Sequence, residues 1–366
     1  MVDRQERQML DNQSGRNRSF RVGLCCILAL IFWLWGAVAY GFVIDETLTN
    51  NTPNNPADDL QDVARWSNVP GSVASNIRGL GEGLEYAIAP DFCSRIIPLF
   101  ADTKPPTCDQ IQTSIQTAMA HWGQDHPSLT FKNVTSQRSA QLPPQGDPEP
   151  WRGFGAEIDL FVLSPQDYPF LADFGAYTSF WYLNENPIGL QGRPLPGKTI
   201  TSADIVFSNQ ACYFWDPRKP IQGCNHFESL LAHEVGHALS LDHPNEFPQR
   251  NFDTDNRLGN VMSIDCQNPT KSLKLSTRID PQAIMNSSLG QSLGTQTQLS
   301  VDDLGGRNFL YPICQARATA KQLSQRPPSW QLFGVLLLGS FTIVFGTTTL
   351  MQQGDKRRRR RYKSGG

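Results

Sequence analysis

The stretch HEVGHALSLDHP, residues 233–244, places three of the chain's six histidines within eleven residues. On a helix, residues four apart lie on one face, so His233 and His237 can present two imidazole nitrogens to one point. Glu234 lies beside that point. His243 can supply a third nitrogen only if the helix stops soon after His237 and the chain turns back. The spacing therefore predicts a three-histidine metal site whose fourth position is open to water.

Many related sites have a glycine at the turn between the second and third histidines, and the residue at that position here is Ser240. A left-handed backbone there favours glycine, because glycine has no Cβ to clash, and a serine costs about 1–2 kcal/mol. Metal binding at protein zinc sites contributes on the order of 10 kcal/mol or more. We therefore expect the strained turn to be tolerated, and Pro244 to prevent the helix from resuming through His243.

Such a site predicts one catalytic Zn²⁺ ion. The metal would lower the pKa of its water toward about 7 and polarise a carbonyl oxygen. Glu234 would take the water's proton and pass it to a departing amine, which is peptide-bond hydrolysis without a covalent enzyme intermediate. The alternative is that the histidines stack on a helix and only pack, but three histidines at ligand spacing favour the metal site.

HEVGHALSLDH resembles the HExxHxxGxxH motif of the metzincins, and specifically of the matrix metalloproteinases, or matrixins. The likeness covers about residues 82–313. Five further stretches resemble, in order, that family's first strand, first helix with its following strand, third strand, pre-helix strand and C-terminal helix: LEYAIAPDF, AMAHWGQDHPSLTFKNV, AEIDLFV, SADIVF and LSVDDLGGRNFLYP.

The resemblance implies an α+β catalytic domain with a twisted, mostly parallel sheet, an active-site helix, a methionine turn and a C-terminal helix. It also implies that Glu234 is the general base and that the zinc ligands are His233, His237 and His243. The methionine turn lies beneath the metal in that family. We favour Met285 for this role, because its distance to the LSVDD helix is close to the family's.

The choice of Met285 makes residues 245–280 an insertion. Met262 is the other candidate for the methionine turn, and either methionine could instead be ordinary core filler.

Three features depart from the family's pattern. No histidine occurs between His126 and His226, so the family's second, structural zinc is not expected. The propeptide cysteine of the family's latency device is missing, and Cys93 is better explained as a disulfide partner. No proline follows Met285, so the family's substrate preference is not transferred. Calcium binding is left open.

The pattern of apolar residues predicts a sheet with helices packed against it. Helical spacing predicts a helix over 107–123 and a second helix, from Phe227, that carries the motif. Ser300 and Asp303 form a capping box that opens a C-terminal helix, and about forty polar residues after Pro244 are expected to form a loop. Alternating apolar residues predict strands at 83–90, 128–134, 156–163, 177–183 and 202–207.

Two apolar runs flank this body. Residues 22–43 follow three arginines, as in a secretory signal or a signal anchor, and both cleavage after 37–39 and retention as an anchor fit. Residues 332–351 match a hydrocarbon core of about 30 Å. Basic residues follow this second run at once and stay on the cytoplasmic side, so the body should lie outside the cytoplasm. A buried core helix, a glycolipid-anchor signal and a removable bacterial sorting tail are the alternatives.

The expected organisation follows from these boundaries. It comprises a leader with a signal peptide or signal anchor (1–43), a linker (44–80), the zinc metalloprotease domain (81–315), a stalk (316–331), a transmembrane helix (332–351) and a basic cytoplasmic tail (352–366).

The formal net charge of −2 conceals an asymmetry between the ends of the chain and its middle. Residues 1–21 carry five basic and three acidic side chains, and residues 356–366 carry seven basic ones, so the remainder sums to −11. Phosphate binding needs basic surface, so an acidic body argues against a nucleic-acid partner. The expected partners are the membrane and a protein or peptide substrate.

Six of the eight cysteines lie in the body, outside the first apolar run. An even number in an oxidising compartment predicts disulfides, with free or metal-bound thiols as the alternative. Short separations favour Cys93 with Cys108 and Cys212 with Cys224, which leaves Cys266 to join Cys314.

Together these features predict a membrane-tethered, extracytoplasmic zinc endopeptidase acting near its own cell surface. Two rivals have the same motif: a surface module that keeps the fold for binding without catalysis, and a zinc hydrolase of a non-peptide bond.

Overall fold

The computed structural model describes residues 43–44, 63–68, 79–143, 155–172, 174–189, 192, 194–195, 197–246, 252–253, 274–275, 279–287 and 295–312. The chain divides into two compact units, Met1–Cys314 and Gln315–Gly366, and all described residues belong to the first. Within the described residues, no helix is both long and apolar enough to cross a membrane. The predicted leader (except Val43), stalk, transmembrane helix and tail lie outside the described residues.

A six-stranded, mostly parallel sheet organises the described part of the chain, as predicted. The order β2-β7-β5-β3-β4 is parallel throughout, and β6 pairs antiparallel with the other edge of β7. Strands β5 and β7, which have neighbouring strands on both sides, are almost entirely buried. The strands are β2 (Ala64–Trp66), β3 (Leu84–Ile88), β4 (Phe131–Asn133), β5 (Ile158–Leu163), β6 (Ala176–Leu183) and β7 (Lys198–Ser208). All five predicted strands are present.

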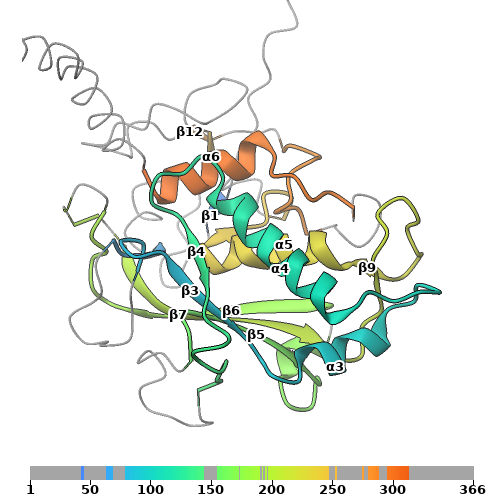
Figure 1. Cartoon of the computed structure of the whole chain (residues 1–366). Coiled ribbons are helices and arrows are strands. Elements are labelled where there is room, and N and C mark those ends of the chain that lie inside the picture. The colour runs from blue at the N-terminus through green and yellow to red at the C-terminus, as the bar shows by residue number, and fades with distance from the viewer. Residues whose placement is uncertain are drawn as a thin grey trace, which may run out of the picture. The chain divides into compact units, whose positions relative to one another are not determined.

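The three longest helices among the described residues are α4 (Cys108–Gly123), α5 (Phe227–Ala238) and α6 (Val301–Leu310). Helices α4 and α5 lie side by side over one face of the sheet (Figure 1). The indole nitrogen of Trp122 in α4 donates to the Ala232 carbonyl oxygen of α5 at 2.7 Å. The capping box of Ser300 and Asp303 begins α6, as predicted. Helix α5 therefore lies between the sheet and α4.

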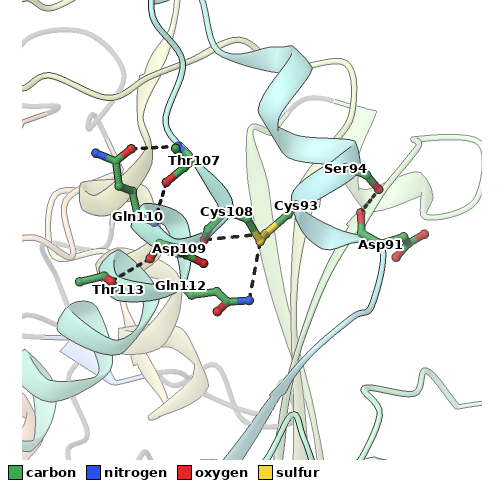
Figure 2. Close-up of a disulfide and its surroundings, with 9 residues drawn as sticks. All are labelled: Asp91, Cys93, Ser94, Thr107, Cys108, Asp109, Gln110, Gln112 and Thr113. Carbon is green, nitrogen blue, oxygen red and sulfur yellow. Dashed lines mark hydrogen bonds between the residues drawn. A yellow bond between two sulfur atoms is a disulfide. The ribbon is translucent and has the colours of Figure 1, made fainter.

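The first predicted disulfide joins Cys93 of the short helix α3 (Phe92–Ile96) to Cys108, the first residue of α4. Figure 2 shows this bond next to a second capping box, in which Thr107 and Gln110 exchange two hydrogen bonds at the start of α4. The disulfide therefore anchors the N-terminus of the helix that supports α5.

The second predicted disulfide, Cys212–Cys224, is also confirmed. It closes the loop between β8 (Tyr213–Phe214) and β9 (Asn225–His226), which pair in parallel immediately before α5. Both halves of the predicted Cys266–Cys314 pair lie outside the described residues.

Residues 44–80 were predicted to be a linker, and this prediction is wrong for the part that forms strand β2. The residues of β2 pair in parallel with β7 and are almost fully buried. The Trp66 indole nitrogen donates to the Ala238 carbonyl oxygen at 2.9 Å, which ties this strand to the end of α5. Three residues are too few to show a period, and their partners lie far along the chain, so the local sequence carried no strand signal.

Two strand pairs besides β8 with β9 occur where no strand was predicted. β1 (Val43–Ile44) pairs antiparallel with β10 (Leu241–Asp242), directly before His243. β11 (Phe252–Asp253) pairs antiparallel with β12 (Lys274–Leu275), inside the stretch expected to be a long loop.

Neighbouring strands β5 and β7 place two buried aspartates opposite each other, Asp159 and Asp204. The carboxylate of Asp159 accepts from the backbone N–H groups of Gln141 and Ala156, each at 3.0 Å. Among the described residues, neither carboxylate oxygen of Asp204 has a hydrogen-bond partner. Burial raises the pKa of Asp159 to about 7. Burial, and then the charge of Asp159, raises the pKa of Asp204 well above its usual range.

This pair predicts a pH-dependent stability. Between pH about 4 and about 7 the native state binds more protons than the unfolded state, so the free energy of unfolding falls as the pH rises. In Asp204→Asn, this decrease in the free energy of unfolding should be smaller by on the order of 1 kcal/mol or more. The measurement is the thermal midpoint at about pH 5 and about pH 8 with zinc held constant. The exposed-carboxylate control Glu82→Gln should keep the wild-type slope; an equally steep slope for Asp204→Asn would contradict the assignment.

Candidate metal centre

Helix α5 carries the first two histidines of the motif. It runs from Phe227 to Ala238, and its N-cap is His226, whose imidazole Nδ1 accepts from the Ser229 backbone N–H at 3.3 Å. Because His233 and His237 are one turn apart, their rings lie on the same face of α5. The ring centroids are 4.7 Å apart.

The chain reverses at Ser240, as predicted. Ser240 has a φ of 72°, in the left-handed region, and its N–H donates to the His237 carbonyl oxygen at 2.7 Å. The side chain is fully buried, and its hydroxyl has no hydrogen-bond partner among the described residues. This turn leads into β10 and brings His243 back beside the other two histidines.

Ser240→Gly is expected to stabilise the domain. Relief of the left-handed strain contributes about 1–2 kcal/mol, and the greater freedom of glycine in the unfolded chain offsets about 0.5–1 kcal/mol of this. A net gain of about 1 kcal/mol raises the thermal midpoint by about 2–4 °C in a domain of this size. Ser240→Ala, which keeps the strained backbone, is the matched control. A lower midpoint for the glycine variant than for the alanine variant would show that the turn is not strained.

The three imidazoles converge through their Nε2 atoms. Each pair among His233, His237 and His243 has an Nε2–Nε2 distance of 3.0 Å. With zinc–nitrogen bonds of about 2.0–2.1 Å, a tetrahedral site separates its nitrogens by about 3.3–3.4 Å. The three nitrogens therefore lie close to the spacing that a single ion requires.

The outer nitrogens of two rings show where the hydrogens are. Nδ1 of His233 lies 2.7 Å from the Ile284 carbonyl oxygen, and Nδ1 of His237 lies 2.7 Å from the Leu241 carbonyl oxygen. A carbonyl oxygen only accepts, so each Nδ1 carries the hydrogen and each Nε2 presents a lone pair. Lone pairs that face one another at 3.0 Å cannot form hydrogen bonds. A cation placed between these nitrogens would accept their lone pairs and remove the repulsion between them.

The electrostatics of the cluster favour neutral rings, which metal ligation requires. Burial, and then the neighbouring imidazole of His243, lowers the pKa of His233 to about 3. Burial and the two neighbouring imidazoles lower the pKa of His237 well below its usual range. The buried histidine cluster could therefore hold a metal ion in the protonation state that it already has.

Glu234 is buried at the same level of α5, with 3% of its surface exposed. Burial raises its pKa to about 7, against the lowering effect of a hydrogen bond from Thr178. The Thr178 hydroxyl lies 2.7 Å from the Glu234 carboxylate and 3.0 Å from the Glu234 carbonyl oxygen. One hydroxyl has one hydrogen, and we assign it to the carboxylate, because that contact is shorter and charge-assisted.

Met285 packs directly against α5. A Cβ at Gly236 would lie 2.2 Å from the Met285 sulfur and 2.8 Å from the Trp122 ring, so only glycine leaves room for both side chains. The preceding residue, Ile284, supplies the carbonyl oxygen that receives His233 Nδ1. The structure thus brings Met285 together with the histidine cluster, whereas Met262 lies outside the described residues.

The remaining histidine near the motif is structural. His226 is 4% exposed, and its Nε2 lies 3.1 Å from the Trp215 carbonyl oxygen. It caps α5 and is not part of the metal-ligating cluster.

Two residues of the site were not expected from sequence: Thr178, which orients Glu234, and Glu246, which contacts His243. Thr178 is one of several polar residues on a strand. Its role depends on which strand lies beside α5, and the local pattern carries no signal for that.

Neither protein-family models nor curated proteins gave any match to this sequence.

Proposed function

We propose that this chain is a zinc-dependent endopeptidase of metzincin type, closest to the matrixins. The observation that carries the proposal is the convergence of three imidazole lone pairs at 3.0 Å from one another, with buried Glu234 on the same helix. The family motif and the order of the flanking stretches support the same class of enzyme. Met285 would form the methionine turn.

His233, His237 and His243 would hold the ion. When bound, zinc makes a coordinated water more acidic and polarises a substrate carbonyl. Glu234 accepts a proton from the attacking water and returns it to the departing amine nitrogen. The hydroxyl of Thr178 holds the Glu234 carboxylate in one orientation. Burial keeps bulk water from competing for the proton.

Strand β6 is the structural element best placed to receive an extended peptide. Among the described strands it pairs only with β7, and its Thr178 reaches the Glu234 carboxylate. An extended segment can add to such an edge through main-chain hydrogen bonds, which are independent of sequence. This geometry favours a protein or peptide substrate over a small molecule.

The compartment proposed is extracytoplasmic, with the chain tethered to a membrane. The two disulfides agree with an oxidising environment. The apolar run at 332–351 and the basic block that follows would anchor the C-terminus with the basic tail in the cytoplasm.

The test compares wild type with Glu234→Gln in cleavage of a generic protein substrate, with and without a chelator. Cleavage that survives the chelator would overturn the zinc proposal, and cleavage that survives the substitution would overturn the role of Glu234. Zinc binding without protein cleavage by wild type would instead favour a binding module or a hydrolase of another bond.

A further inference from the structure

The three histidines of the cluster differ in the hydrogen-bond acceptor that their Nδ1 atoms contact. His233 and His237 donate from Nδ1 to backbone carbonyl oxygens. His243 instead places Nδ1 at 3.1 Å from the carboxylate of Glu246. One of the three rings is therefore paired with a charged acceptor, and the other two with neutral ones.

His243 is also the histidine with the least support from regular structure. It follows the two-residue strand β10, whereas the other two histidines project from helix α5. Its side chain is 19% exposed. An imidazole on such a turn needs a side-chain partner to fix its rotation and its tautomer. A carboxylate acceptor on Nδ1 does both, because it keeps the hydrogen there and leaves Nε2 free to ligate.

Glu246 is itself held in place. Its backbone N–H donates to the His243 carbonyl oxygen at 3.2 Å, and its carboxylate also accepts from the side chain of Ser287. The adjacent Asn245 receives the Ser287 backbone N–H at 2.9 Å. Ser287 follows Met285 by two residues, so these bonds join the turn of the third histidine to the segment packed against α5.

We propose that Glu246 is a positioning residue that orients His243 for the metal. The inference rests on the proposed zinc site and adds to it a residue that does not touch the ion. Outer partners of ligating histidines typically change metal affinity about 10–100-fold when removed.

The experiment measures zinc affinity of the full-length chain in detergent by competition with a chromophoric chelator. Glu246→Ala should weaken zinc binding about 10–100-fold. Glu246→Gln keeps an acceptor oxygen without the charge, so it should weaken binding less than alanine does. The exposed Glu82→Gln is the matched control and should bind as wild type does. The visible spectrum of the cobalt-substituted protein should shift for Glu246→Ala only.

Ser287→Ala distinguishes two explanations: that Glu246 orients the His243 ring, and that Glu246 only stabilises the loop in which it lies. If Glu246 acts only by holding the loop, Ser287→Ala should weaken zinc binding as much as Glu246→Ala, and that equality would overturn the inference. Wild-type affinity in Glu246→Ala would also overturn it, while the proposed enzyme would stand. A wild-type chain that binds no zinc would overturn both.

Discussion

Replacing Glu234 with glutamine is expected to abolish peptide hydrolysis while leaving zinc bound. Glutamine has the shape of glutamate and can still accept the hydrogen bond from Thr178, so the histidine cluster should be undisturbed. It cannot take a proton from water, and positioned proton transfer contributes about 10²–10⁴-fold to such reactions. The turnover rate should therefore fall by at least about 100-fold. The measurements are cleavage of a protein substrate and zinc content of the same samples.

Glu228→Gln is the matched control for that result. Glu228 lies in the first turn of the same helix and accepts from the Ser114 hydroxyl at 2.7 Å, away from the histidines. Its amide variant should cleave at close to the wild-type rate. Cleavage by Glu234→Gln within a few-fold of wild type would remove Glu234 from the mechanism, even if zinc remains bound.

His237→Ala should lose zinc, and with it the stabilisation that zinc confers. Zinc binding of about 10 kcal/mol or more is shared among few ligands, so loss of one imidazole should weaken affinity at least about 100-fold. At zinc concentrations 100 times the Kd, binding stabilises the native state by about 2.7 kcal/mol. That corresponds to about 5–10 °C in the thermal midpoint of a domain of this size. Wild type should lose this increment when a chelator is added, whereas the variant should not respond.

His121→Ala tests whether the response belongs to the cluster. His121 lies in the last turn of α4, outside the three-histidine cluster, so its variant should keep the wild-type response to chelator. A His237→Ala chain that still binds zinc with wild-type affinity, and still loses stability on chelation, would place the metal elsewhere.

Local patterns predicted most of the regular elements near the site. The alternation in LEYAI and IDLFVL corresponds to β3 and β5, and the Ser300–Asp303 capping box begins α6. These predictions hold because alternation, helical spacing and capping are properties of a few consecutive residues. Strand β2 and the pair of β1 with β10 were missed, since each is two or three residues long and is stabilised by partners distant in sequence.

The sequence alone determined which side chains could form a metal site. Helical spacing places His233 and His237 on one face, and Pro244 prevents the helix from continuing through His243. Only the tertiary structure decided what surrounds those rings. Thr178 reaches Glu234 from a neighbouring strand, and Ile284 receives the His233 hydrogen from a segment 51 residues away. The reason is physical: a ligand set follows from local backbone geometry, whereas burial and outer hydrogen bonds exist only where distant segments pack together.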